Sequence, residues 1–218
     1  HPRARTSNGA QIVCMNSARE IETPESAVAA YVLIFSGVVA ALQIGKLPPA
    51  LPEISQALGM TLTQSGFLLS FIQLAGMSLA LAIGMSADTF GAKRSMLLGL
   101  MLLGLASGMG SMATGVASLM VWRIFEGLGF LCVVLPAPGL IRQHVNALQL
   151  RKLLGYWGAY MPAGTALTLL FGPLWLPEWG WRSWWLLFAL LSWAMAFVLW
   201  RVVPADVPLT SVAIHGQQ

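Results

Sequence analysis

Two charged side chains, Arg123 and Glu126, interrupt the apolar stretch of residues 116–135. Their spacing of three residues places them on one face of a helix. A charged side chain at the centre of a membrane costs roughly 2.5–3.5 kcal/mol on insertion scales, so such residues face a partner or a water-filled cavity. Either they form an ion pair that only holds helices together, or they form an anion site or a proton-coupling element.

A short polar turn carries the second group of candidate residues. It contains Asp88, Gly91, Lys93 and Arg94 between two apolar stretches. Asp88 precedes the next expected helix, whose N-terminal end favours a negative charge, and Gly91 permits a tight backbone turn. On these features alone, this is a turn whose basic residues fix the orientation of the chain in a membrane.

Uncharged polar side chains in apolar stretches are further candidates. Gln43 and Gln73 are expected to face the interior of a helix bundle rather than lipid. Tyr156 and Tyr160 are four residues apart, so both either line a cavity or pack against lipid or a neighbouring helix. We interpret the tryptophan cluster as an aromatic belt at the membrane interface. Its members are Trp175, Trp179, Trp181, Trp184 and Trp185.

The sequence offers no pattern for catalysis or for metal binding. It contains no Ser/His/Asp set, no paired carboxylates and no glycine-rich phosphate loop. No Cys/His cluster has metal-ligand spacing. Cys14 lies in a polar stretch and Cys132 in an apolar one, so no disulfide is expected. We therefore expect neither an enzyme nor a bound metal or cofactor.

The composition indicates an integral membrane protein. Hydrophobic residues make up 57% and charged residues 9% of the 218 residues, whereas an ordinary soluble domain carries roughly 25% charged residues. The mean hydropathy is +0.73. These values exclude a soluble enzyme, a disordered tail and a nucleic-acid-binding module, in spite of the net charge of +4. Lipid must cover much of the surface.

The elements that position these residues are expected to be membrane-spanning helices. A spanning helix needs about 20 apolar residues, and the sequence accommodates six, which predicts an all-α integral membrane fold. We place the helices at about 26–45, 64–84, 95–112, 116–141, 154–175 and 183–203. Residues 1–25 and 204–218 are expected to be polar tails. Lys46 and the prolines that follow it are expected to end the first helix.

Basic residues predict the orientation. With six helices, both tails and the loops after the second and fourth helices share one side. That side holds Arg3, Arg5, Arg19, Lys93, Arg94, Arg142, Arg151, Lys152 and Arg201. The other side holds only Lys46 and Arg182. Because positive residues favour the cytoplasm, both termini are expected there.

The polar turn resembles the loop signature of the major facilitator superfamily, G-x-x-x-D-R-x-G-x-R-R. Gly84, Asp88, Gly91, Lys93 and Arg94 match it, whereas Thr89 replaces a basic residue. In the family this loop gates the cytoplasmic side through salt bridges. The resemblance implies that role here, without the salt bridge that a basic residue in place of Thr89 would form.

The stretch around Arg123 resembles the family's helix-four pattern, R-x-x-Q/E-G-x-G. Arg123, Glu126, Gly127 and Gly129 match it. In the family this arginine is implicated in coupling transport to protons. The resemblance implies that role for Arg123, with Glu126 as its partner, and a substrate or coupling site that also includes Gln43, Gln73, Tyr156 and Tyr160.

The resemblance covers about residues 26–203 and is nearest to the branch with cyanate and 2-nitroimidazole transporters. Family members have twelve helices in two halves, so this chain is expected to be the N-terminal half, with residues 204–218 a cytoplasmic tail or the start of the linker. The implied function is proton-linked transport of a small anion or weak acid across a bacterial plasma membrane. The implied partners are the solute, protons, lipid and a C-terminal half or a second copy. Two alternatives remain open: drug or metabolite efflux by the same fold, and a six-helix bundle that does not transport or that works as a homodimer.

Overall fold

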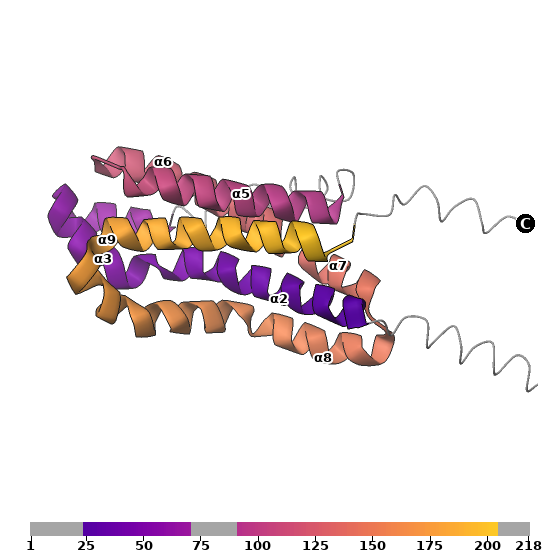
Figure 1. The fold of residues 1–218 in the computed structure, drawn as a ribbon. Coiled ribbons are helices and arrows are strands. Elements are labelled where there is room, and N and C mark those ends of the chain that lie inside the picture. The colour runs from indigo at the N-terminus through magenta and orange to yellow at the C-terminus, as the bar shows by residue number, and fades with distance from the viewer. Residues whose placement is uncertain (1–23, 71–90, 205–218) are drawn as a thin grey trace, which may run out of the picture.

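The computed structural model of the protein describes residues 24–70 and 91–204, which form helices joined by short turns (Figure 1). The named helices are α2 (Pro24–Gly45), α3 (Leu47–Leu58), α5 (Ala92–Ser111), α6 (Val116–Val134), α7 (Ala137–His144), α8 (Ala147–Gly158) and α9 (Tyr160–Val202). Residues 62–70 form a further helical segment.

The first membrane-spanning element does not end at the proline cluster. α3 follows α2 directly after Lys46, whose backbone N–H donates to the carbonyl oxygen of Leu42 at 2.9 Å. Pro48 lies in the first turn of α3, where a helix needs no N–H from that residue. α2 itself ends at Gly45 as expected, but the chain continues at once as α3. The expected place of Lys46 outside the bundle is wrong, because none of its surface is exposed.

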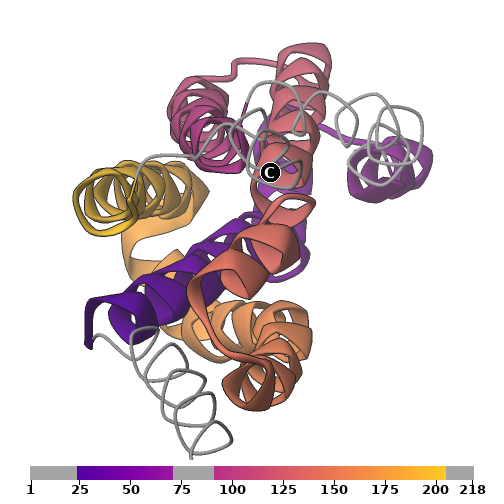
Figure 2. The ribbon, with the colours of Figure 1, turned by 90° about the vertical axis from the view of Figure 1, so that its right-hand side faces the viewer.

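A sharp turn divides α9 into two helical segments, residues 160–179 and 181–202. Gly180 adopts φ 74° and ψ 164°, a conformation that a residue with a Cβ rarely adopts. Figure 1 shows that the chain reverses here, so that the two segments run in opposite directions. Figure 2 shows α2 between them.

Two side chains stabilise the turn at Gly180. The Glu53 Oε1 atom of α3 accepts a hydrogen bond from the backbone N–H of Trp181 at 3.0 Å, so a carboxylate meets the positive end of the second segment. Arg182 donates to the carbonyl oxygens of Ser111 and Ala113 at 2.6 and 3.1 Å. A cation there matches the negative C-terminal end of α5.

The core lies between α2, α5, α6 and α9. α2 packs against both α9 and α6, and α5 packs against α6 and α9. α5 and α6 approach closely at Gly129, where an added Cβ would lie 2.9 Å from the carbonyl oxygen of Gly99 and 3.1 Å from the backbone nitrogen of Leu103. Small residues permit such backbone contact between membrane helices, which gives this glycine of the helix-four pattern a packing role.

Within the described residues, four helical stretches are long and apolar enough to cross a membrane: Ala27–Leu58, Ala92–Ser111, Val116–His144 and Gln149–Val202. The last contains the reversal at Gly180. The helix expected at residues 64–84 extends beyond the described residues. The all-helical fold agrees with the sequence, whereas the count of six spanning helices stays a prediction.

Candidate functional site

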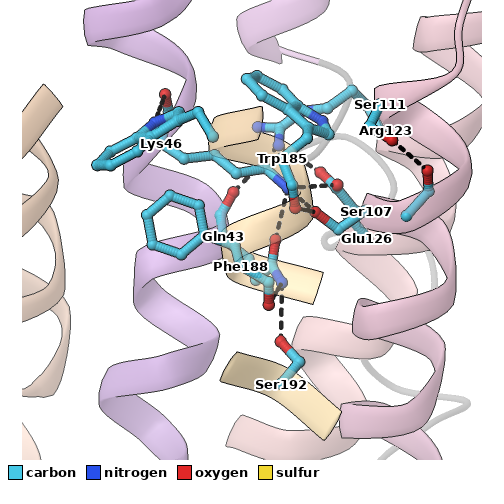
Figure 3. Close-up of polar contacts among 11 residues, drawn as sticks. Gln43, Lys46, Ser107, Ser111, Arg123, Glu126, Trp185, Phe188 and Ser192 are labelled. Atoms are coloured by element: carbon cyan, nitrogen blue, oxygen red, sulfur yellow. Dashed lines mark hydrogen bonds and ion pairs between the residues drawn. The ribbon is translucent and has the colours of Figure 1, made fainter. Parts of the chain in front are cut away.

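Lys46 lies at the centre of a buried polar cluster (Figure 3). Its Nζ atom donates to Gln43 Oε1 at 2.5 Å and to Ser107 Oγ at 2.6 Å. It also forms an ion pair with Glu126 Oε1 at 2.7 Å. An ammonium group has three N–H donors, so each one meets an acceptor here, from α2, α5 or α6.

Glu126 is shared by two cations. Its Oε1 atom pairs with Lys46, and its Oε2 atom accepts from Arg123 Nη1. The same Arg123 nitrogen donates to the backbone carbonyl oxygen of Gln43 at 3.0 Å. Arg123 and Glu126 are 1% and 0% exposed, so the three charges are removed from solvent. Buried charges require such close partners.

Gln43 connects the charges to α9. Its Nε2 group donates to the carbonyl oxygen of Phe188 at 3.0 Å and to Ser192 Oγ at 2.8 Å. Its Oε1 atom accepts from Lys46, and its backbone oxygen accepts from Arg123. Gln43 is therefore bonded to α6, to α9 and to the lysine beside it on the same face of the first spanning element.

Two tryptophans enclose the lysine. The ring of Trp185 lies 4.6 Å from Lys46 Nζ, a favourable cation–π distance. Trp184 Nε1 donates to the backbone oxygen of Lys46 at 3.1 Å, and Ser107 Oγ donates to that of Trp185 at 2.8 Å. Both rings are almost fully buried. These two residues therefore pack inside the bundle, and their place in an interfacial belt stays a prediction.

The cluster carries more positive than negative charge. With all groups ionised, Lys46 and Arg123 contribute two positive charges and Glu126 one negative charge. Among the buried side-chain atoms that the structure describes, Arg123 Nε and Trp185 Nε1 are the two without a hydrogen-bond partner. Such groups are rare in folded proteins because each costs free energy. Excess positive charge and unused N–H donors together suit a small molecule that accepts hydrogen bonds or carries a negative charge.

Most of the chain matches one known protein family. Residues 33–217 match the sequence profile of the Major Facilitator Superfamily. The chain belongs to this superfamily. Its members are membrane transporters for small solutes, not enzymes. Within the described residues of this chain, no group of three His, Cys, Asp or Glu side chains could hold a metal ion.

Individual relatives are similar over only part of their length. The puromycin resistance protein of Streptomyces alboniger is 31% identical over 163 residues, which are 72% of this chain and 31% of that protein. Two crystal structures of a bacterial homologue of the human lysosomal transporter Spinster, both inward-facing, superpose with TM-scores of 0.79 (unoccupied) and 0.78 (occupied). Their identities are 15% and 14%, and each covers 86% of this chain. The chain spans about 45% of the solved transporter's length. These structures show the same fold.

Gly84 and Asp88 of the loop signature lie outside the described residues, as does the candidate residue Gln73. Gly91 precedes α5 with φ 96°, a backbone conformation that favours glycine. Lys93 Nζ donates to the carbonyl oxygen of Trp200 at 3.2 Å and to that of Val203. These carbonyls end α9, where a cation is favourable.

The remaining predicted residues fall in different places. Arg94 is exposed at the first turn of α5, and Gly127 is buried in α6. Tyr156 is 46% exposed, and Lys152 Nζ lies 5.9 Å from the centre of its ring. Tyr160 stacks on Trp157 with ring centres 4.6 Å apart. Neither tyrosine is among the residues bonded to the Lys46 cluster, so their role in the site stays a prediction.

The sequence interpretation brought Gln43, Arg123 and Glu126 together and missed Lys46, Ser107 and Trp185. A signal for Lys46 was present. Lys46 follows Gln43 by three residues, which places both on one helix face. It is also the single charge between Ala27 and Pro52. The prolines after Lys46 favour a break in the helix, but Pro48 lies in the first turn of the next helix.

Proposed function

We propose that this chain is the N-terminal half of a secondary active transporter that moves a small solute across a membrane in a proton-linked cycle of alternating access. The observation that carries the proposal is the buried cluster of Lys46, Arg123 and Glu126 inside stretches long enough to cross a membrane. Ionisable residues in such positions typically mark solute pathways or proton relays. The two halves of the superfamily fold enclose the solute site between them.

A small anion or weak acid is the solute class that the charges favour. The fully ionised cluster holds one positive charge in excess, and Arg123 Nε and Trp185 Nε1 have hydrogen atoms with no acceptor in the described residues. An anion beside these groups would neutralise the excess charge and give an unpaired N–H donor an acceptor. The expected likeness to cyanate transporters stays a prediction, and cyanate serves as a probe of the anion class.

Drug or metabolite efflux is the second candidate function. It is supported by the likeness to the puromycin resistance protein of Streptomyces alboniger. The two functions differ in the charge of the solute, since puromycin carries an amine and cyanate a negative charge. Labelled puromycin and labelled cyanate therefore separate the two candidates in one assay.

The cellular arrangement completes the proposal. We place the chain in a bacterial plasma membrane with both termini in the cytoplasm, and a C-terminal half or a second copy completes the pathway. An immunoblot of native membranes tests this point. A band near twice 23.4 kDa would support one long transporter, whereas a band near 23.4 kDa would favour a dimer of halves, or a bundle that does not transport.

The transport test uses the native protein at its full length in proteoliposomes, with labelled cyanate and labelled puromycin as probes. Arg123→Ala is the test substitution, and Arg151→Ala, which removes an exposed arginine of α8, is the control. We expect Arg123→Ala to lower the initial rate ~10-fold or more, since truncating one partner of a buried charge pair costs about 2–5 kcal/mol. Normal insertion with unchanged uptake would refute the role of Arg123. Absence of uptake of either probe by the wild type would refute the proposed function.

A further inference from the structure

The buried cluster holds one positive charge in excess when all of its groups are ionised. Lys46, Arg123 and Glu126 are 0–1% exposed, and one carboxylate is shared by two cations. A buried charge without a counter-charge is costly, and folded proteins avoid it by binding an opposite charge or by moving a proton. The cluster therefore has two neutral forms. One contains a bound anion, and the other contains one proton fewer.

Only one of the three charged groups can release the proton that makes the cluster neutral. The guanidinium of Arg123 keeps its proton throughout the pH range of proteins. Protonation of Glu126 would raise the charge of the cluster from +1 to +2. Loss of a proton from Lys46 lowers it to zero and leaves the ion pair of Arg123 and Glu126 in place.

The surroundings of Lys46 can accept this change. Its ammonium donates to Gln43, Ser107 and Glu126. When the proton leaves to water, the N–H bond breaks and its electron pair becomes a lone pair on Nζ. The Ser107 hydroxyl, which donates to the backbone oxygen of Trp185 in this structure, can rotate and donate to that lone pair.

We infer that Lys46 is the residue that carries the coupling proton of this transporter. The inference rests on the proposed function. It adds a residue on the first spanning element to the Arg123 and Glu126 pair of the sequence pattern. The Trp185 ring covers Lys46 Nζ, and its N–H has no hydrogen-bond partner among the described residues.

Other ionisable groups on the packed elements have different partners. Glu53, on the element that carries Lys46, bonds to the backbone of Trp181. α5 faces Lys46 with Ser107, while Lys93 bonds at the far end of α9. On α9, Arg182 bonds to carbonyl oxygens at the end of α5. Within the described residues, Glu126 and Arg123 are thus the charged groups that act on Lys46.

The experiment measures solute movement in two ways with the full-length protein in proteoliposomes. Exchange of labelled for unlabelled solute at equal pH needs no net proton movement. Accumulation against a pH gradient does need it, and one proton per solute gives ~10-fold accumulation for each pH unit. The probes are labelled cyanate and labelled puromycin.

Two substitutions at position 46 fix the charge of the proton-carrying side chain, one as positive and the other as neutral. Lys46→Arg keeps the positive charge permanently, and Lys46→Gln removes it permanently. Lys152→Arg changes an exposed lysine of α8 and is the matched control. We expect the wild type and Lys152→Arg to accumulate solute, and both Lys46 variants to reach only equal concentrations, with exchange preserved in at least one of them. Cyanate is expected to move with the proton and puromycin against it, so the transported probe also assigns the solute class.

The possible outcomes separate this inference from the proposed function. Accumulation by either Lys46 variant at the wild-type level would overturn the assignment of Lys46. Loss of exchange in both variants, with monodisperse folded protein, would also overturn it, because Lys46 would then be a structural or solute-binding residue. If the wild type neither exchanges nor accumulates either probe, the proposed function fails, and the assignment fails with it.

Discussion

The carboxylate of Glu126 is expected to contribute to the free energy of unfolding by pairing with two buried cations. Its two carboxylate oxygens pair separately with Lys46 and Arg123. Glu126→Gln would keep the shape of the side chain and remove its charge. The cluster would then hold two positive charges without a counter-charge while Lys46 keeps its proton, and one if Lys46 releases it. Removing one partner of a buried ion pair costs about 3–5 kcal/mol. We expect a loss of at least that size, since two pairs are broken at once.

Lys46→Met provides the comparison. It removes the excess charge, leaves the pair of Arg123 and Glu126 intact and fills the space with a flexible apolar side chain. The remaining cost is that of acceptors left without a donor, about 1–3 kcal/mol for each unsatisfied buried group. The removal of a buried charge offsets part of this cost. Lys46→Met should therefore be clearly less destabilising than Glu126→Gln, although both break the same ion pair.

Unfolding in detergent, followed by tryptophan fluorescence, would measure both variants. Glu178→Gln, at an exposed position of α9, is the control for loss of a carboxylate and should be neutral within about 0.5 kcal/mol. The double variant Lys46→Met with Glu126→Gln restores a single buried charge, so it should be more stable than Glu126→Gln alone. A Lys46→Met variant as unstable as Glu126→Gln would refute the reasoning from charge balance.

Two further predictions concern the framework around the cluster. Gly129→Ala should destabilise the fold by about 1–3 kcal/mol, because the added methyl group would meet backbone atoms of α5; Gly139→Ala, which meets open space, should not. Thermal unfolding of the two variants compares them directly. Glu53→Ala should cost about 1 kcal/mol through loss of the bond to the Trp181 N–H. Gln56→Ala, at a nearby exposed position, should cost less than half of this, and an equal loss in both would contradict the capping role.

The sequence predicted the part of the site that local rules determine. Arg123 and Glu126 are the two charges of an apolar helix, and their spacing of three residues makes a contact within one helix. The structure contains that contact. Gln43 was expected to face the interior because lipid offers its amide no partner. It lies inside the protein with all of its amide groups bonded.

The missed residues depend on contacts between distant segments. Lys46 and Glu126 are 80 residues apart, so no local spacing connects them. Trp184 and Trp185 follow the reversal at Gly180, which turns them towards α2. Their position near a turn suggested the membrane interface. The direction of the second segment of α9, and not its composition, decides that they are buried.

The bonds of the cluster also indicate which helices must move together. Lys46 and Gln43 join the first spanning element to α5, to α6 and to the second segment of α9. A motion that separated any of these helices would expose a charge or leave a buried amide without a partner, and each broken buried pair costs about 3–5 kcal/mol. The least costly motion keeps these four elements as one body. Alternating access, as proposed for this chain, would then occur by tilting the whole bundle against its partner half, while the proton on Lys46 changes the charge that the bundle presents to the solute.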